Sequence, residues 1–193
     1  MEGILIKNLL QKVLKKDDES ERILFEMFYN KVYKTAYLFT KDHYLAQDVV
    51  QETFEKAFKQ LHRLKNPENA GAWLGSIATN TAIDLMRKKK RWNDSPTEDV
   101  YIENELSKVE TNSIDMEIER VFLIKSIRTH ISNLKEEYKQ VIVLRYLYEM
   151  KENEIAEALG IKTGTVKSRL HRAKLKLKEM LMNSYEKEES ANE

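Results

Sequence analysis

Apolar residues recur along most of the chain with the 3.6-residue period of an α-helix, and the alternation typical of a β-strand is nearly absent. In the first half this period predicts helices over residues 4–14, 20–38, 42–58 and 72–91, with Asp42 as the N-cap of the third. Only 5 Gly and 2 Pro interrupt the 193 residues. The pattern therefore predicts an all-α fold.

The same period continues in the second half, where it predicts helices over about 117–132, 135–149, 151–159 and 163–182. The last two are separated by Gly160, at a position where a helix C-terminus favours a residue that tolerates positive φ. A short helix, a glycine turn and a second helix in this order predict a helix-turn-helix.

The second helix of this pair has one apolar side and one basic side. Thr163 or Thr165 is expected to cap it, and Val166, Leu170 and Ala173 form its buried side. The opposite side presents Lys167, Ser168, Arg169, His171, Arg172 and Lys174. A helix of this size fits the major groove of DNA, where such side chains reach phosphates and base edges. The alternative is a solvated helix at the end of an ordinary bundle.

The formal net charge is only +1, but the charges are segregated along the chain. Residues 87–91 are an unbroken cationic run, and residues 162–178 contain seven Lys or Arg and no acid. Between these blocks, residues 93–119 contain nine acids and the single Lys108. Two basic blocks on either side of an acidic stretch suggest two contacts with nucleic acid, joined by a segment that avoids duplex DNA.

These boundaries predict two small helical domains joined by a flexible acidic linker. We expect the domains at residues 1–92 and 117–185, the linker at 93–116, and a disordered polar tail at 186–193. No stretch has the features of a signal peptide or the length of a membrane span, which favours a cytoplasmic protein.

The composition argues against catalysis and metal binding. The chain contains no cysteine, and its 4 histidines lie far apart in the sequence. We find no nucleophile–base pair, no glycine-rich phosphate loop and no cluster of metal ligands. We therefore expect a protein that is not an enzyme, with no cofactor, no metal and no small-molecule substrate.

One predicted helix has an acidic outer face. Within residues 46–55 the apolar side chains point inward, and the polar face consists of Asp48, Gln51, Glu52 and Glu55. On the charges alone, an ordinary solvated face and a binding surface are about equally favoured.

Taken together, three segments resemble the extracytoplasmic-function (ECF) sigma factors, the two-domain initiation factors of bacterial RNA polymerase. Residues 37–58 are similar to the family's polymerase-binding helix, and residues 72–91 to the segment that opens the promoter and reads its −10 element. Residues 134–177 are similar to the domain that reads the −35 element. The resemblance covers nearly the whole chain outside the linker and the tail.

The resemblance implies a role for each polar surface. Asp48, Gln51 and Glu52, with Glu55 beside them, would contact the β′ coiled coil of the polymerase. The residues expected at the melted −10 strand are Asn80, Asp84, Arg87, Lys88 and Trp73, although a tryptophan at this position is more often part of the core. The loop 64–71 would help to form a pocket for a flipped base. Gly75, where an aromatic residue is common, is expected to soften the helix.

In the second domain, Lys167, Ser168, His171 and Arg172 would enter the major groove at the −35 element. Thr165 and Arg169 would hold phosphates, or Arg169 would pair with an acid instead. The linker would follow the RNA exit path, or serve only as a soluble tether.

The resemblance also implies the partners. These are core RNA polymerase, through its β′ and β subunits, promoter DNA and an inhibitory anti-sigma factor, often membrane-anchored, that would hold the protein at the membrane. The competing interpretation is a stand-alone helix-turn-helix regulator. That class needs a dimer surface or an α/β receiver domain, and the first domain shows no strand pattern.

Overall fold

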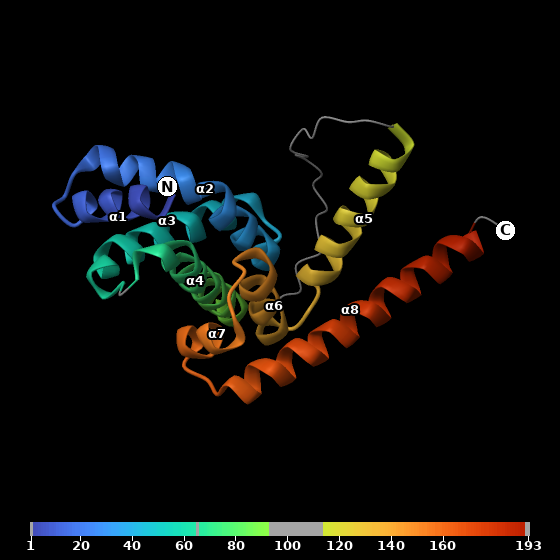
Figure 1. Ribbon diagram of the computed structural model, residues 1–193. Helices are drawn as coiled ribbons and strands as arrows, with labels where there is room; N and C mark the ends of the chain where they lie inside the picture. The colour runs from blue at the N-terminus through green and yellow to red at the C-terminus, as the bar shows by residue number, and fades with distance from the viewer. Residues whose placement is uncertain (1, 65, 93–113, 192–193) are drawn as a thin grey trace.

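The structure is a computed structural model that describes the backbone of residues 2–64, 66–92 and 114–191, and the side chains of 5–64, 66–91 and 123–184. Its regular elements are all helical over these ranges (Figure 1). They are α1 (Glu2–Val13), α2 (Asp18–Thr40), α3 (His43–Gln60), the short 3-10 helices η1 (Leu61–Arg63) and η2 (Pro67–Asn69), α4 (Ala70–Trp92), α5 (Ile114–Ser132), α6 (Glu136–Ile142), the π-helical turn η3 (Val143–Leu147), α7 (Glu152–Leu159) and α8 (Thr163–Ala191).

The helices α2, α3 and α4 pack against one another, and α1 covers α2 and η2 (Figure 1). Side-chain caps fix where the helices begin. Asp17 accepts a hydrogen bond from the Ser20 amide at 3.0 Å, and Asp42 accepts from the amides of Tyr44 and Leu45 at 2.9 and 3.1 Å. These bonds satisfy first-turn amides that have no partner within the helix. The predicted cap at Asp42 is therefore confirmed.

The C-terminal helices α6 and α7 pack on the first half of α8, and α5 contacts α8. The helices α5 and α8 then diverge toward their far ends (Figure 1). Most of the predicted linker, residues 93–113, lies outside the described residues, and its last three residues belong to α5. Helix α8 continues to Ala191, where the sequence predicted a disordered tail from residue 186. The tail contains four Glu, one Lys and one Ala, which favour helix, and it contains no Gly or Pro to end one.

A π-helical turn interrupts the helix predicted over residues 135–149. The α-helical hydrogen bonds end at Ile142, and the amide of Tyr148 then donates to the Val143 carbonyl at 3.2 Å. Glu149 has a φ of 58°, which reverses the chain before Met150. Tyr148 and Met150, the residues on either side of Glu149, are both buried.

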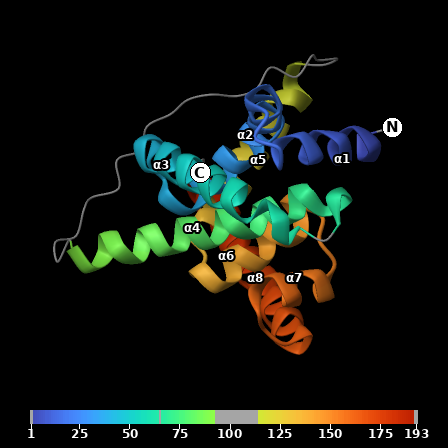
Figure 2. The same cartoon turned by 90° about the vertical axis from the view of Figure 1, so that its left-hand side faces the viewer.

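The two halves of the chain share one hydrophobic core. Val32, Val49 and Ala78 of the N-terminal helices belong to the same buried cluster as Leu144 and Ile155 of the C-terminal helices. The closeness of α6 and α7 to α4 is visible after a quarter turn (Figure 2). The sequence predicted two domains but gave no sign that they pack together through apolar side chains.

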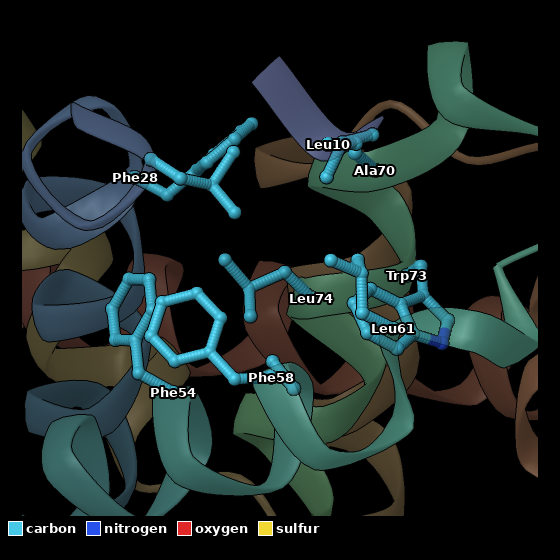
Figure 3. Close-up of a pocket in the computed structure, with 10 residues that line it drawn as sticks. Leu10, Phe28, Phe54, Phe58, Leu61, Ala70, Trp73 and Leu74 are labelled. Atoms are coloured by element: carbon cyan, nitrogen blue, oxygen red, sulfur yellow. The ribbon is translucent and has the colours of Figure 1, made fainter. Parts of the chain in front are cut away.

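A second, smaller apolar cluster lies where α1, α2, η1 and the start of α4 meet. Figure 3 shows the pocket at this point, with Phe54 and Phe58 on one side of Leu74 and with Trp73 and Leu61 on the other. The half-buried Trp73 ring packs against this apolar cluster, which agrees with the core alternative, and its contact with the −10 strand stays a prediction.

Candidate polymerase and nucleic-acid interfaces

The acidic face of α3 points into solvent because the opposite face of the helix is in the core. Ala46, Val49, Val50, Thr53, Phe54 and Ala57 are buried. On the outer face, Asp48, Gln51 and Glu55 are exposed and Glu52 is half-buried. The structure therefore brings together all four residues predicted to contact polymerase.

Lysines on the same helix balance part of this acidic face. Lys56 lies 2.8 Å from Glu52, and Lys59 lies 3.9 Å from Glu55. Both are i,i+4 pairs, which contribute little to stability in water. Asp48 is exposed and forms no ion pair with any residue in the described part of the chain, so it is the carboxylate on this face best placed to bind a cation on another protein.

Apart from Trp73 in the first turn, the predicted −10 residues lie from the middle of α4 toward its end, and two of them contact the C-terminal half of the chain. The Asn80 carboxamide oxygen accepts a 2.7 Å hydrogen bond from Gln140 of α6. Arg87 Nε lies 3.1 Å from the carboxylate of Glu136, also on α6. Asp84 and Lys88 are exposed. The four side chains therefore form an exposed surface, and α6 contacts two of them.

The basic end of α4 is also suited to its position. Lys89, Lys90 and Arg91 occupy the last turn, where cations interact favourably with the negative end of the helix dipole. Within the loop 64–71, predicted to form a base pocket, residues 67–69 form η2 and the last two residues begin α4. Asn66 caps η2 by accepting a hydrogen bond from the Glu68 amide at 3.1 Å. Helix α4 begins at Ala70, two residues earlier than predicted, and continues without a break past Gly75.

The predicted helix-turn-helix is formed by α7 and α8. Gly160 has a φ of 63°, and its amide and that of Ile161 donate to carbonyls in the last turn of α7. A residue with a Cβ is strained in this left-handed conformation, which explains the glycine. Helix α8 then begins at Thr163, and Val166, Leu170 and Ala173 are buried as predicted.

The outer face of α8 is polar and open. Lys167, Ser168, His171 and Arg172 are exposed, and Thr165 and Arg169 are half-buried. Arg169 lies 3.9 Å from Glu137, which agrees with the acid-pairing alternative for this residue. Lys167 lies 3.9 Å from Glu152 of α7. Because these ion pairs are long, the two cations remain available to phosphates.

An apolar groove separates α5 from α8 and has a volume of about 510 Å³. Its apolar lining comes from both helices, from α6 and from η3, and Lys174 and Lys178 lie at its edge. The apolar lining residues are Ile127, Ile131, Ile142, Tyr146, Leu177, Leu181 and Met182. Tyr146 and Met182 are exposed, as large apolar side chains at binding surfaces often are.

The sequence gave no indication of the residues that join the two halves. Gln140 and Lys139 of α6 are both buried, although a polar residue and a lysine on a predicted helix would ordinarily be placed in solvent. Their burial depends on contacts with segments about 60 to 100 residues away in the chain, among them Asn80 and Phe39. Only the apolar residues around them, such as Tyr138 and Val141, carried a signal of burial.

Comparison with known proteins agrees with this arrangement. Residues 24–92 match the family described as Sigma-70 region 2, and residues 124–177 match Sigma-70, region 4. The chain is 30% identical to the ECF RNA polymerase sigma factor SigW of Bacillus subtilis, over 92% of this chain and 97% of SigW. It is 34% identical to the RNA polymerase sigma factor SigV of Bacillus subtilis, over 73% of this chain and 78% of SigV.

A solved structure has the same fold. It is the sigma factor RpoE in complex with the anti-sigma factor NepR from Bartonella quintana, with a TM-score of 0.61 and 24% identity over 83% of this chain and 96% of that one. The two family matches and the curated relatives thus show a sigma factor of RNA polymerase, with regions 2 and 4 of that class. Within that class, the chain belongs to the ECF RNA polymerase sigma factors.

No three His, Cys, Asp or Glu side chains in the described part of the chain lie where they could hold a metal ion. Over the same residues, no helix is both long enough and apolar enough to cross a membrane.

Proposed function

We propose that this ECF sigma factor binds core RNA polymerase through the acidic face of α3 and recognises a two-part promoter through α4 and α8. In this assignment the face of α4 that holds Asn80, Asp84, Arg87 and Lys88 binds the separated −10 strand. The outer face of α8 reads the −35 element in the major groove. The protein supplies specificity to the polymerase, has no catalytic activity of its own and works in the cytoplasm.

The observation that carries this proposal is the arrangement of polar surfaces on three different helices. Each of α3, α4 and α8 buries its apolar side in the core and presents a polar side of the required chemistry. Acids on α3 suit a basic protein surface, while cations on α4 and α8 suit phosphates. A duplex binder that acts alone needs the α8 surface but has no use for the other two.

The groove between α5 and α8 is a further protein-binding surface. Its apolar lining and cationic edge suit an amphipathic segment that carries acidic residues. We assign it to the β subunit of the polymerase. A contact there would fix α8 relative to the enzyme, so that the −35 and −10 elements are engaged together.

We also propose control by an anti-sigma factor. The relative RpoE was solved in complex with the anti-sigma factor NepR. In this chain the polar surfaces of α3 and α8 are open and can be masked by such a partner. If the anti-sigma factor is anchored in the membrane, it would hold the sigma factor there until a signal releases it.

A triple substitution tests the polymerase-binding face. We expect Asp48→Ala, Gln51→Ala and Glu52→Ala together to abolish binding to purified core polymerase, because they remove the solvent-facing acids and carboxamide without touching the core. The matched control is Glu19→Ala, Glu26→Ala and Asn30→Ala, which removes the same kinds of exposed side chain from α2. Binding is measured by size-exclusion chromatography, and folding by circular dichroism.

The outcomes separate the alternatives. Loss of binding in the α3 variant alone supports the assignment. Normal binding by a well-folded α3 variant would refute it. Equal loss in both variants would show that general negative charge, not this face, attracts the polymerase.

A further inference from the structure

A close backbone approach joins the two halves of the protein at Gly75. This glycine lies in the second turn of α4 and is buried. A Cβ atom placed on it would lie 2.6 Å from Cγ and Cδ1 of Tyr148 and 2.7 Å from its Cδ2. Carbon atoms in contact are normally about 3.5 to 4 Å apart, so no other residue fits here unless the ring moves. The α4 backbone thus forms a socket for an aromatic ring supplied by the C-terminal half.

Tyr148 is held in this socket from a second side by α2. Its hydroxyl group lies 3.0 Å from that of the fully buried Thr35. The Lys31 ammonium lies 4.9 Å from the ring centroid, which adds a cation–π contact. Burial raises the pKa of Tyr148 to about 12, so the phenol stays protonated and can serve as a hydrogen-bond donor. One side chain therefore ties the turn after η3 to both α2 and α4.

Beside the socket, α6 occupies groups that the proposed function assigns to promoter DNA. Gln140 donates to Asn80 at 2.7 Å and to the Thr79 hydroxyl at 3.3 Å. Glu136 pairs with Arg87 at 3.1 Å. A carboxamide that accepts this bond cannot offer the same oxygen to a base edge, and a guanidinium beside a carboxylate is a poorer site for a phosphate.

We propose that Tyr148, seated on Gly75, is a latch that holds α6 over the −10 face of α4, so that closure of the latch and binding of the promoter strand exclude each other. The inference depends on the assignment of α4 in the proposed function. By linkage, whatever separates the two halves raises the affinity for the −10 strand, and strand binding in turn favours separation. The outer face of α3 is exposed in the closed state, so polymerase can dock there before the latch opens.

Gly75→Ala tests the latch directly. Alanine is a better helix former than glycine, so any separation of the two halves in this variant does not result from a weaker α4. The matched control is Gly164→Ala, because a Cβ atom at Gly164 meets no other atom within 4 Å. Tyr148→Ala is a second variant that empties the same socket from the other side. Circular dichroism verifies that each variant keeps its helix content.

The distance between the halves is measured in the full chain without polymerase or DNA. Because the protein has no cysteine, Lys59→Cys and Glu179→Cys give two unique, exposed sites for spin labels. Double electron–electron resonance should show one narrow distance distribution in the parent and in Gly164→Ala. It should be longer and broader in Gly75→Ala and Tyr148→Ala. Unchanged distributions in these two variants would overturn the latch.

Strand binding is then measured by fluorescence anisotropy with a pool of random single-stranded DNA at low salt. If the open state is about a tenth of the parent population, opening raises the apparent affinity by up to roughly tenfold. A gain in both latch variants that is lost on adding Asn80→Ala and Arg87→Ala supports mutual exclusion. If the two halves separate in these variants but the affinity for single-stranded DNA does not rise, Tyr148 holds the halves together without masking α4. That result would refute mutual exclusion. Binding that never depends on Asn80 and Arg87 would refute the α4 assignment itself.

Discussion

Replacing Lys139 with methionine should stabilise the protein at neutral pH. Lys139 is 5% exposed, and its ammonium lies 5.1 Å from the centroid of the Phe39 ring. Its pKa is lowered from the ordinary value of 10.5 to about 8, mainly by burial and also by the nearby charge of Lys41, while Glu136 opposes the change. Below this pKa the buried side chain is charged, and its desolvation destabilises the native state.

The magnitude follows from the pKa difference between the native and unfolded chains. One pKa unit corresponds to about 1.4 kcal/mol, so the charged lysine destabilises the native state by roughly 3 kcal/mol at pH 7. Methionine has a similar length and no charge, but it forgoes a cation–π contact of about 0.5 to 1 kcal/mol. We therefore expect Lys139→Met to raise the free energy of unfolding by roughly 2 kcal/mol at pH 7.

The sign of the pH dependence is fixed by the direction of the pKa change. Between about pH 8 and 10.5 the native state binds fewer protons than the unfolded chain, so wild-type stability rises with pH across this window. Below about pH 8 both states are charged, and the destabilisation is present in full. The advantage of Lys139→Met should therefore shrink by about 2 kcal/mol between pH 7 and pH 9.5.

Urea denaturation followed by circular dichroism at these two pH values measures the effect. Lys34→Met, at an exposed position of α2, is the matched control and should change stability little at either pH. A gain from Lys139→Met that is the same at both pH values, or a loss of stability at pH 7, would refute the argument from buried charge.

Three further predictions concern the C-terminal half. Gly160→Ala should cost about 1 to 2 kcal/mol in urea denaturation because of its left-handed backbone, whereas Gly164→Ala should be close to neutral. Leu144→Ala, at a fully buried position of the shared core, should cost about 2 to 5 kcal/mol in the same assay. In the polymerase-bound protein, Arg172→Ala should lower the preference for matched over scrambled −35 sequences, and Lys174→Ala should weaken binding to both alike. Equal loss on the two sequences for Arg172→Ala would contradict base readout by this residue.

Local patterns in the sequence predicted most of the secondary structure and the surfaces. Val166, Leu170 and Ala173 were predicted as the buried side of α8, and the Asp42 cap and the outward face of α3 also lie where the pattern placed them. These features depend on residues within one or two turns of each other, and such spacing is visible in a sequence.

Features that depend on distant segments were not predictable. Gly75 was expected to soften α4. The structure explains this glycine differently, because the ring of Tyr148, 73 residues further along the chain, leaves no room for a Cβ atom. Likewise, Asn80 and Arg87 were predicted to lie at the −10 strand, and nothing near them in the sequence reveals their partners on α6. The predicted end of α8 was wrong for a local reason. The polar composition after residue 185 suggested disorder, although Glu and Lys favour helix.

Transcription by purified core polymerase tests the central claim most directly. The protein is mixed with bacterial core RNA polymerase and genomic DNA, and the 5′ ends of the RNA are sequenced. We predict new transcripts that start downstream of a shared two-part motif, absent when the α3 triple variant is used. A lack of such transcripts, together with tight binding of the protein alone to duplex DNA, would contradict the account and favour a stand-alone regulator.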